Sequence, residues 1–244
     1  MKQRYRIADR IIEIRSLHPL IHEQCWEYCV TGVPDFSIEI TPPDISFERE
    51  KSAQADQAKE RAIQFYSGDY LETLAVYRKI AERMPEYDTV LFHGSAIAVD
   101  GWAYLFTARS GTGKSTHARL WRELLGDKAI MVNDDKPLIR ISDSGAVIYG
   151  TPWDGKHHLS NNIAVPLKAI CILERAKENA IRPVTREEAL PMLIQQTYRP
   201  AYPLTLAKTL MLIDRLGRDV KLYRLGCNMD IGAAKLSYDA MKEG

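Results

Sequence analysis

The stretch FTARSGTGKSTHARLW, residues 106–121, constrains what this chain can fold into more than any other part of the sequence. It sets a glycine-containing turn and a lysine between an apolar run and a run with helical spacing. The usual phosphate-binding pattern is G-x-x-x-x-G-K-[ST], and here the frame runs from Ala108 to Ser115, with alanine in the first place. Alanine is tolerated where the chain leaves a strand unless φ is positive, so the sequence still predicts a phosphate-binding turn between a strand and a helix.

Each residue type in this turn has a task in a phosphate site. Gly111 and Gly113 allow backbone N–H groups to turn inward around a phosphate. Lys114 supplies positive charge to the outer phosphates, and Ser115 offers a hydroxyl to Mg²⁺. The helix predicted over residues 114–125 and closed by a glycine adds the positive end of its dipole.

A second run, IMVNDD, places two carboxylates at the end of a predicted strand. Asp134 and Asp135 could have separate roles, one holding Mg²⁺ through water and the other accepting a proton from an attacking hydroxyl. The metal and Lys114 would keep both ionised, although mutual repulsion could raise one pKa. The alternative interpretation is an Asp-Asp turn that caps a loop before Lys136-Pro137.

The first 87 residues predict an N-terminal α/β lobe. Residues 4–14 and 35–41 alternate as strands do, and the second of these stops at Pro42-Pro43. Polar residues 48–62 are open to three interpretations, a strand end, a loop or a helix. Helices are predicted over 18–30 and from Tyr70 to Arg83.

Residues 88–244 predict a mixed sheet with peripheral helices. Asp100-Gly101 suits the positive φ values of a type I′ turn and joins the apolar runs 89–99 and 102–106 as a hairpin. A second hairpin is expected across SDSG, residues 142–145. Antiparallel hairpins beside the phosphate-binding turn favour a mixed sheet over a doubly wound parallel one. The remaining expected elements are strands over 167–175 and 220–226 and helices over 186–198, 204–216 and 231–242.

Composition excludes several classes of partner. The 33 Lys and Arg residues nearly balance the 32 Asp and Glu residues, so no net charge favours nucleic acid or an anionic membrane. No stretch approaches the ~20 apolar residues of a membrane span, and the charged start MKQRYRIADR lacks the apolar core of a signal peptide. Four cysteines do not make a disulfide scaffold, so a cytoplasmic location is expected.

The runs LFHGSAIAV, SGTGKST and NDD, in this order and spacing, resemble the catalytic domain of the bacterial HPr kinase/phosphorylases over about residues 88–175. That family shares its fold with the ATP-dependent phosphoenolpyruvate carboxykinases. The resemblance implies an α/β fold with a mixed β-sheet P-loop domain of this type over residues 88–244, beside the N-terminal lobe over 1–87. It also implies ATP and Mg²⁺ as cofactors.

Carried over by position, the resemblance implies a role for each site residue. Ser115 and Asp134 would lie on the metal side, and Asp135 is slightly favoured as the base. His93, placed on the strand before the first hairpin, matches the family's histidine near the transferred phosphate. The implied nucleotide contacts are Ser110, Gly111, Thr112, Gly113, Lys114, Ser115 and Thr116.

The leading hypothesis is a kinase that transfers the γ-phosphoryl group of ATP to an alcohol acceptor, a serine hydroxyl of a protein or peptide, or a small molecule. Two alternatives are a nucleotide-gated module that binds a partner without catalysis and a carboxykinase-like lyase. Lys156 and His157 could supply positive charge near the acceptor or lie on a plain surface loop, and Arg199 is a further candidate. Self-association is expected from the resemblance, since HPr kinases form oligomers.

Overall fold

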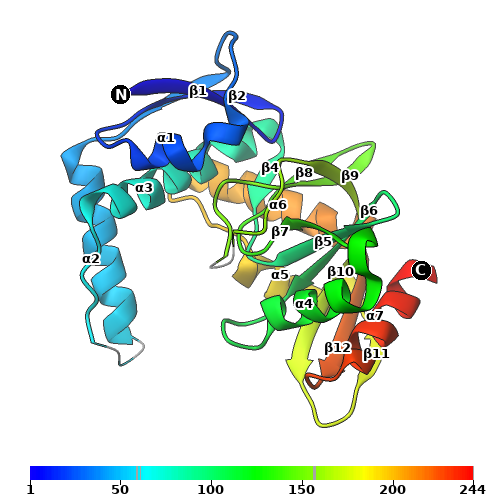
Figure 1. Cartoon of the computed structure of the whole chain (residues 1–244). Helices are drawn as coiled ribbons and strands as arrows, with labels where there is room; N and C mark the ends of the chain where they lie inside the picture. Colours follow the sequence, from blue (N-terminus) through cyan, green and yellow to red (C-terminus); the bar gives the residue numbers. More distant parts are fainter. Residues whose placement is uncertain (59, 61, 156–157, 244) are drawn as a thin grey trace. The chain divides into compact units, whose positions relative to one another are not determined.

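The computed structural model describes residues 1–58, 60, 62–155 and 158–243, which form two compact units divided between Arg83 and Met84 (Figure 1). The sequence predicts a boundary after residue 87. In the structure the 3-10 helix η2 (Met84–Tyr87) is part of the second unit, where it contacts β4 and α6. Within the described residues, no helix combines the length and the apolar character that crossing a bilayer requires.

The first unit contains a three-stranded sheet. β1 (Lys2–Ile7) and β2 (Arg10–Arg15) are antiparallel, and β3 (Phe36–Glu39) runs parallel to β2. Ala8 and Asp9 join β1 to β2 with φ values of 48° and 61°, the two left-handed positions of a tight hairpin turn. The prediction of one strand over residues 4–14 is therefore wrong, because alanine does not signal a positive φ in a sequence.

Three α-helices belong to the first unit. They are α1 (Leu20–Gln24), α2 (Pro42–Ala58) and α3 (Gly68–Arg83), with the 3-10 helix η1 (Trp26–Tyr28) after α1. The helix predicted over 18–30 is thus much shorter, and the open interpretation of the polar segment resolves as α2. Arg78 of α3 holds α2 through its Nε, 2.5 Å from Glu48, and its Nη2, 3.2 Å from Asp44. Partners on α3, rather than an apolar stripe, make this polar segment helical.

The second unit is built on one mixed sheet, which confirms the predicted α/β class. Its strands are β4 (Thr89–Leu91), β5 (Ser95–Val99), β6 (Trp102–Thr107), β7 (Ile130–Asn133), β8 (Leu138–Ser142), β9 (Gly145–Tyr149), β10 (Ala164–Arg175), β11 (Ala180–Pro183) and β12 (Lys221–Cys227). They follow the order β4-β8-β9-β10-β6-β5-β7, and β12 pairs with both β10 and β11. The start of β10 pairs antiparallel with β9, and its later part runs parallel to β6 and β12.

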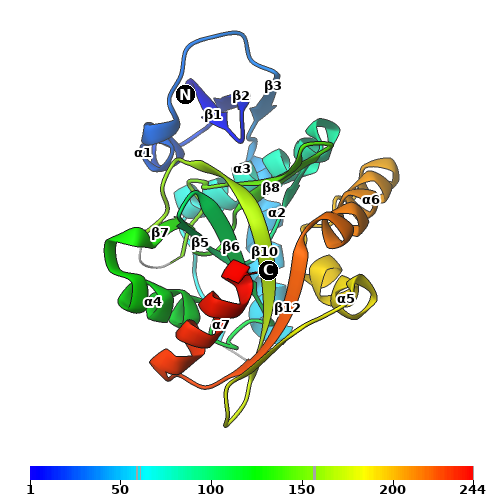
Figure 2. The same cartoon turned by 90° about the vertical axis from the view of Figure 1, so that its right-hand side faces the viewer.

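Helices cover both faces of this sheet (Figure 2). The helices are α4 (Lys114–Leu125), α5 (Arg186–Gln196), α6 (Pro203–Asp219) and α7 (Ile231–Glu243), and the 3-10 helix η3 (Gly126–Lys128) follows α4. α4 and α7 bury Trp121 and Met241 against one face, whereas α5 and α6 bury Leu193 and Leu216 against the other. The four helices predicted in this half of the chain are confirmed within a few residues at each end.

Both predicted hairpins are confirmed. Asp100 and Gly101 have φ values of 51° and 82° and join β5 to β6, and β8 pairs with β9 across residues 143–144. The run over 89–99 is two strands rather than one, since β4 pairs with β8 whereas β5 pairs with β6 and β7. The break falls at His93-Gly94, where a Cβ on Gly94 would lie 2.8 Å from the Phe106 carbonyl oxygen. His93 therefore lies between strands, which corrects its predicted place on a strand.

Candidate functional site

The predicted site residues of the second unit meet at one edge of the sheet. β5 is antiparallel to both β6 and β7, so these two strands end where β5 begins. The turn at 108–113 follows β6, the carboxylates at 134–135 follow β7, and His93 precedes β5. Three segments far apart in the sequence thus reach the same sheet edge because of strand pairing alone.

The turn after β6 has the backbone of a phosphate cradle. Gly111 and Gly113 have φ values of 78° and 125°, which L side chains rarely adopt. Among the described residues, apart from its two chain neighbours, no atom lies within 4 Å of where a Cβ on Gly111 would stand, so the space beside the turn is open at this glycine. Ala108 is fully buried and is absent from the residues with positive φ, so alanine fits the first position of the pattern.

Helix α4 begins directly after this turn. Its first intrahelical hydrogen bond runs from the His117 N–H to the Gly113 carbonyl oxygen at 2.9 Å. The backbone N–H groups of residues 113–116 therefore come before the first hydrogen bond of the helix. Those amides and the positive end of the helix dipole suit an anion. Ser115 is exposed in the first turn, where its hydroxyl is accessible.

Lys114 lies at the base of the cradle. Its Nζ donates to the Ala108 carbonyl oxygen at 3.2 Å, and the side chain is largely buried. Burial lowers the pKa of Lys114, and the charges of Asp135 and Asp134 act in the opposite direction. The lysine therefore lies within electrostatic reach of both carboxylates that follow β7.

A buried asparagine, to which the run IMVNDD assigned no role, shapes the acidic turn. The Asn133 side-chain oxygen accepts the N–H groups of Asp135 at 2.9 Å and Lys136 at 2.6 Å. Its Nδ2 donates to Thr151 Oγ1 at 3.1 Å and to the Trp153 carbonyl oxygen at 3.4 Å. An Asx residue that caps its own turn is a recognisable sequence signal. Here it fixes the backbone conformation of the turn that carries the two carboxylates.

Asp134 is the buried member of the acidic pair. Its Oδ1 accepts a hydrogen bond from Ser95 Oγ at 2.8 Å, and only 6% of the residue is exposed. A Cβ on Gly155 would lie 2.9 Å from Asp134 Oδ2, so the chain there passes close to this carboxylate. The loop of residue 155 and the start of β5 therefore hold Asp134 on two sides.

Asp135 is half-buried and pairs with His93. Its Oδ1 lies 3.2 Å from His93 Nε2, and its Oδ2 lies 3.6 Å from Lys136 Nζ. Burial raises the pKa of Asp135, but the hydrogen bond from His93 and the Lys136 charge outweigh burial and bring the pKa below its ordinary value. The carboxylate is accordingly ionised at neutral pH.

Gln196, at the end of α5, holds His93 from the other side. Its backbone oxygen accepts the His93 N–H at 2.8 Å, and its side-chain oxygen lies 2.8 Å from His93 Nδ1. The Tyr198 N–H continues the contact by donating to the Leu91 carbonyl oxygen. This pairing brings the exposed Arg199 to the same edge, whereas Lys156 and His157 lie outside the described residues. No sequence pattern links 196 to 93, so only the fold could reveal it.

Ser115 and Asp134 are the side chains of this edge that could contribute oxygen ligands to a magnesium ion bound with a nucleotide. Across the described chain, no three His, Cys, Asp or Glu side chains come close enough to hold a metal ion. Mg²⁺ usually takes one or two protein ligands and completes its shell with phosphate oxygens and water. Ser115 and Asp134 offer such a partial set beside an open cradle.

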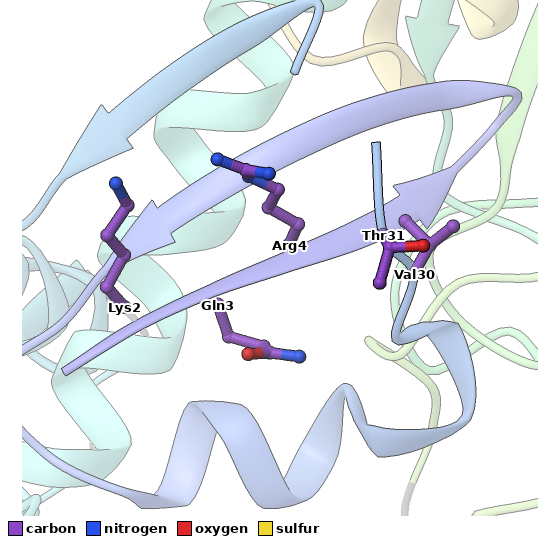
Figure 3. Close-up of a pocket in the computed structure, with 5 residues that line it drawn as sticks. All are labelled: Lys2, Gln3, Arg4, Val30 and Thr31. Atoms are coloured by element: carbon purple, nitrogen blue, oxygen red, sulfur yellow. The ribbon is translucent and has the colours of Figure 1, made fainter. Parts of the chain in front are cut away.

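The first unit contains an open pocket of about 250 Å³ (Figure 3). Its lining residues are Lys2, Gln3, Arg4, Val30 and Thr31. Lys2 Nζ and Arg4 Nε each lie 3.1 Å from the Glu13 carboxylate, which Arg15 also contacts, so three cations share one carboxylate here.

Comparisons with known proteins give one family match. The family model described as "SynChlorMet cassette protein ScmC" matches residues 69–205, more than half of the chain. No curated protein matches the sequence. Among solved structures, the HPr(Ser) kinase/phosphatase from Coxiella burnetii is 14% identical, with 52% of this chain and 96% of that chain covered and a TM-score of 0.28. That TM-score is too low to support a conclusion about shared fold or activity.

Proposed function

The chain belongs to the SynChlorMet cassette protein ScmC family, and we propose that it is a kinase dependent on ATP and Mg²⁺. It transfers the γ-phosphoryl group to an alcohol acceptor, a serine hydroxyl of a protein or peptide, or a hydroxyl of a small molecule. The observation that carries the proposal is the convergence of Lys114, at the base of an open glycine cradle, with Asp134 and Asp135. A phosphate cradle alone would support nucleotide binding, and the two aspartates add groups that phosphoryl transfer needs.

The residues of the cradle bind and orient the nucleotide. The amides of 113–116 and the Lys114 ammonium hold the phosphates, while Ser115 and Asp134 are the residues that would hold Mg²⁺. Bound Mg²⁺ would neutralise charge on the group being transferred. These groups are held in place by the sheet edge, so binding needs little reorganisation.

Asp135 is the proposed base. The acceptor oxygen bonds to the γ-phosphorus as the bond from that phosphorus to the β-bridging oxygen breaks, and the hydroxyl proton passes to the Asp135 carboxylate. His93 contacts this carboxylate and keeps it ionised. Gln196 is a positioning residue that acts through His93.

Asp135→Asn tests this assignment. Transfer should fall about 100-fold or more, the usual contribution of a general base, whereas nucleotide affinity should change little. The protein is incubated with MgCl₂, ATP labelled in the γ-phosphoryl group, and a pool of peptides and metabolites, and labelled products are detected by mass spectrometry. Calorimetry with ATP measures binding separately.

The matched control is Asp143→Asn, which removes an exposed carboxylate paired with Arg215 in a hairpin turn. It should transfer phosphate at the wild-type rate. Wild-type labelling by Asp135→Asn would refute the base assignment. Nucleotide binding by the wild-type chain with no labelled product from any pool would favour the non-catalytic module instead.

A further inference from the structure

Arg175 ends strand β10 beside the phosphate cradle. β10 runs parallel to β6 with Ile172 paired to Thr107, so the carboxyl ends of both strands lie at the same edge. The Arg175 guanidinium Nη2 donates to the Gly111 carbonyl oxygen at 2.5 Å. A cation from a different strand therefore touches the outer side of the cradle.

The charge of Arg175 is not balanced by the described chain. No carboxylate among the described residues pairs with it, although neighbouring Arg182 and Arg224 pair with Glu188 and Glu174. A guanidinium has five N–H donors, and the contact with Gly111 uses one. The exposed side chain thus keeps most of its donors and both of its flat faces for a ligand.

Strand order gives the cradle two different sides. In the order β12-β10-β6-β5-β7, the acids follow β7 on one side of the cradle, and Arg175 follows β10 on the other. If the proposed function holds, the γ-phosphoryl group faces Asp134 and Asp135. The nucleoside end of the same ligand then extends over the ends of β10 and β12.

An apolar side chain lies on that second side. Arg175 is paired in register with Cys227 at the end of β12, and the Ala176 N–H donates to the Cys227 carbonyl oxygen. Met229 follows two residues later and is 79% exposed. A flat cation and a polarizable thioether are both side chains that pack well on an aromatic base.

We propose that Arg175 and Met229 form the surface that receives the base of the nucleotide, with the guanidinium stacked on the base. This inference rests on the proposed function, because the acids orient the triphosphate. It adds a base-binding surface to a site whose sequence pattern specifies only phosphate contacts.

Arg175→Ala and Arg175→Lys test the inference by calorimetry with ATP and with inorganic tripolyphosphate. Loss of a stacked guanidinium should weaken ATP binding about tenfold, the ratio for a cation–π contact of middle strength, and leave tripolyphosphate binding unchanged. Lysine keeps the charge and the reach to Gly111 but not the flat group, so Arg175→Lys should lose most of the same affinity. Arg182→Ala, an exposed arginine on β11, is the matched control and should bind both ligands as the wild type does.

Equal losses for ATP and tripolyphosphate would mean that Arg175 only braces the cradle, and would overturn the inference. Full ATP affinity in either Arg175 variant would overturn it as well. Both results leave the proposed kinase standing, because they require a wild-type chain that binds nucleotide. A wild-type chain that binds neither ligand refutes the proposed function, and this inference with it.

Discussion

At the scale of single residues, one buried amide shapes the acidic end of the site. Asn133 is fully buried, accepts two backbone N–H groups of the acidic turn and donates to oxygens of residues 151 and 153. Both halves of the amide are therefore used, and neither a carboxylate nor an apolar side chain could replace it. This residue therefore fixes the backbone from which the two aspartate side chains extend.

Asn133→Asp is expected to destabilise the protein by about 3 kcal/mol. The substitution loses the donor half of the amide and buries a charge beside Asp134, and an uncompensated buried charge costs about that much. Urea unfolding followed by circular dichroism measures the free energy. Asn179→Asp is the control, because the partly exposed Asn179 uses its side-chain oxygen as the acceptor for the Asn228 N–H, which aspartate preserves. Equal stability of Asn133→Asp and wild type would contradict this role.

At the scale of elements, the helix that begins in the cradle is joined to the last helix of the chain by a polar core contact. Ser237 of α7 donates to the Ala233 carbonyl oxygen at 2.9 Å, and its oxygen lies 2.8 Å from Trp121 Nε1 and 3.0 Å from His117 Nε2. Its oxygen therefore accepts from both rings of α4. Burial lowers the pKa of His117 to about 4, so the ring is neutral near pH 7 and Nε2 carries its proton.

Ser237→Ala should destabilise the protein by about 3 kcal/mol. The Trp121 and His117 N–H groups would both lose their acceptor in a dry core, and each unsatisfied donor costs about 1–3 kcal/mol. The measurement is chemical unfolding, with Ser144→Ala in the exposed β8–β9 turn as a control expected to change stability by less than about 0.5 kcal/mol. A change as small for Ser237 as for Ser144 would show that the contact contributes little.

At the scale of the whole molecule, the chain is two units, and the matched family region crosses their boundary. The match begins inside α3 and ends inside α6, and it includes the cradle, both aspartates and Arg175. The sheet of the first unit and the final elements β12 and α7 lie outside it. The proposed transfer site is therefore inside the family region, whereas Met229 of the proposed base surface is outside it.

The first unit is expected to be the first part cut by chymotrypsin. Residues 62–67 between α2 and α3 have no regular secondary structure, and Phe65 is 91% exposed. Trp102 is also exposed, but its backbone is paired within β6, so it should resist. Mass spectrometry should find a first fragment ending at Phe65, and Phe65→Ser should delay that cut. An earlier cut at Trp102 would contradict this expectation.

Local patterns alone predicted much of the second unit. The helix after the cradle, its glycine stop, both hairpins and the mixed sheet each depend on residues close together in the chain. Local signals failed where the backbone conformation was unusual for its residue type, as at Ala8, or where a partner far along the chain decided the outcome. Helix α2 is the clearest example, because its stabilising contacts come from α3.

By itself, the sequence determined the chemistry available to this protein, namely a glycine cradle with its lysine and a strand that ends in two carboxylates. Only the tertiary structure decided which groups share one edge of the sheet. It did so because β5 runs antiparallel to β6 and β7, and because α5 returns Gln196 to His93. It also placed Arg175 on the opposite side of the cradle from the acids. Strand pairing joins residues that are many positions apart in the sequence, so no local sequence pattern could predict that these residues are neighbours.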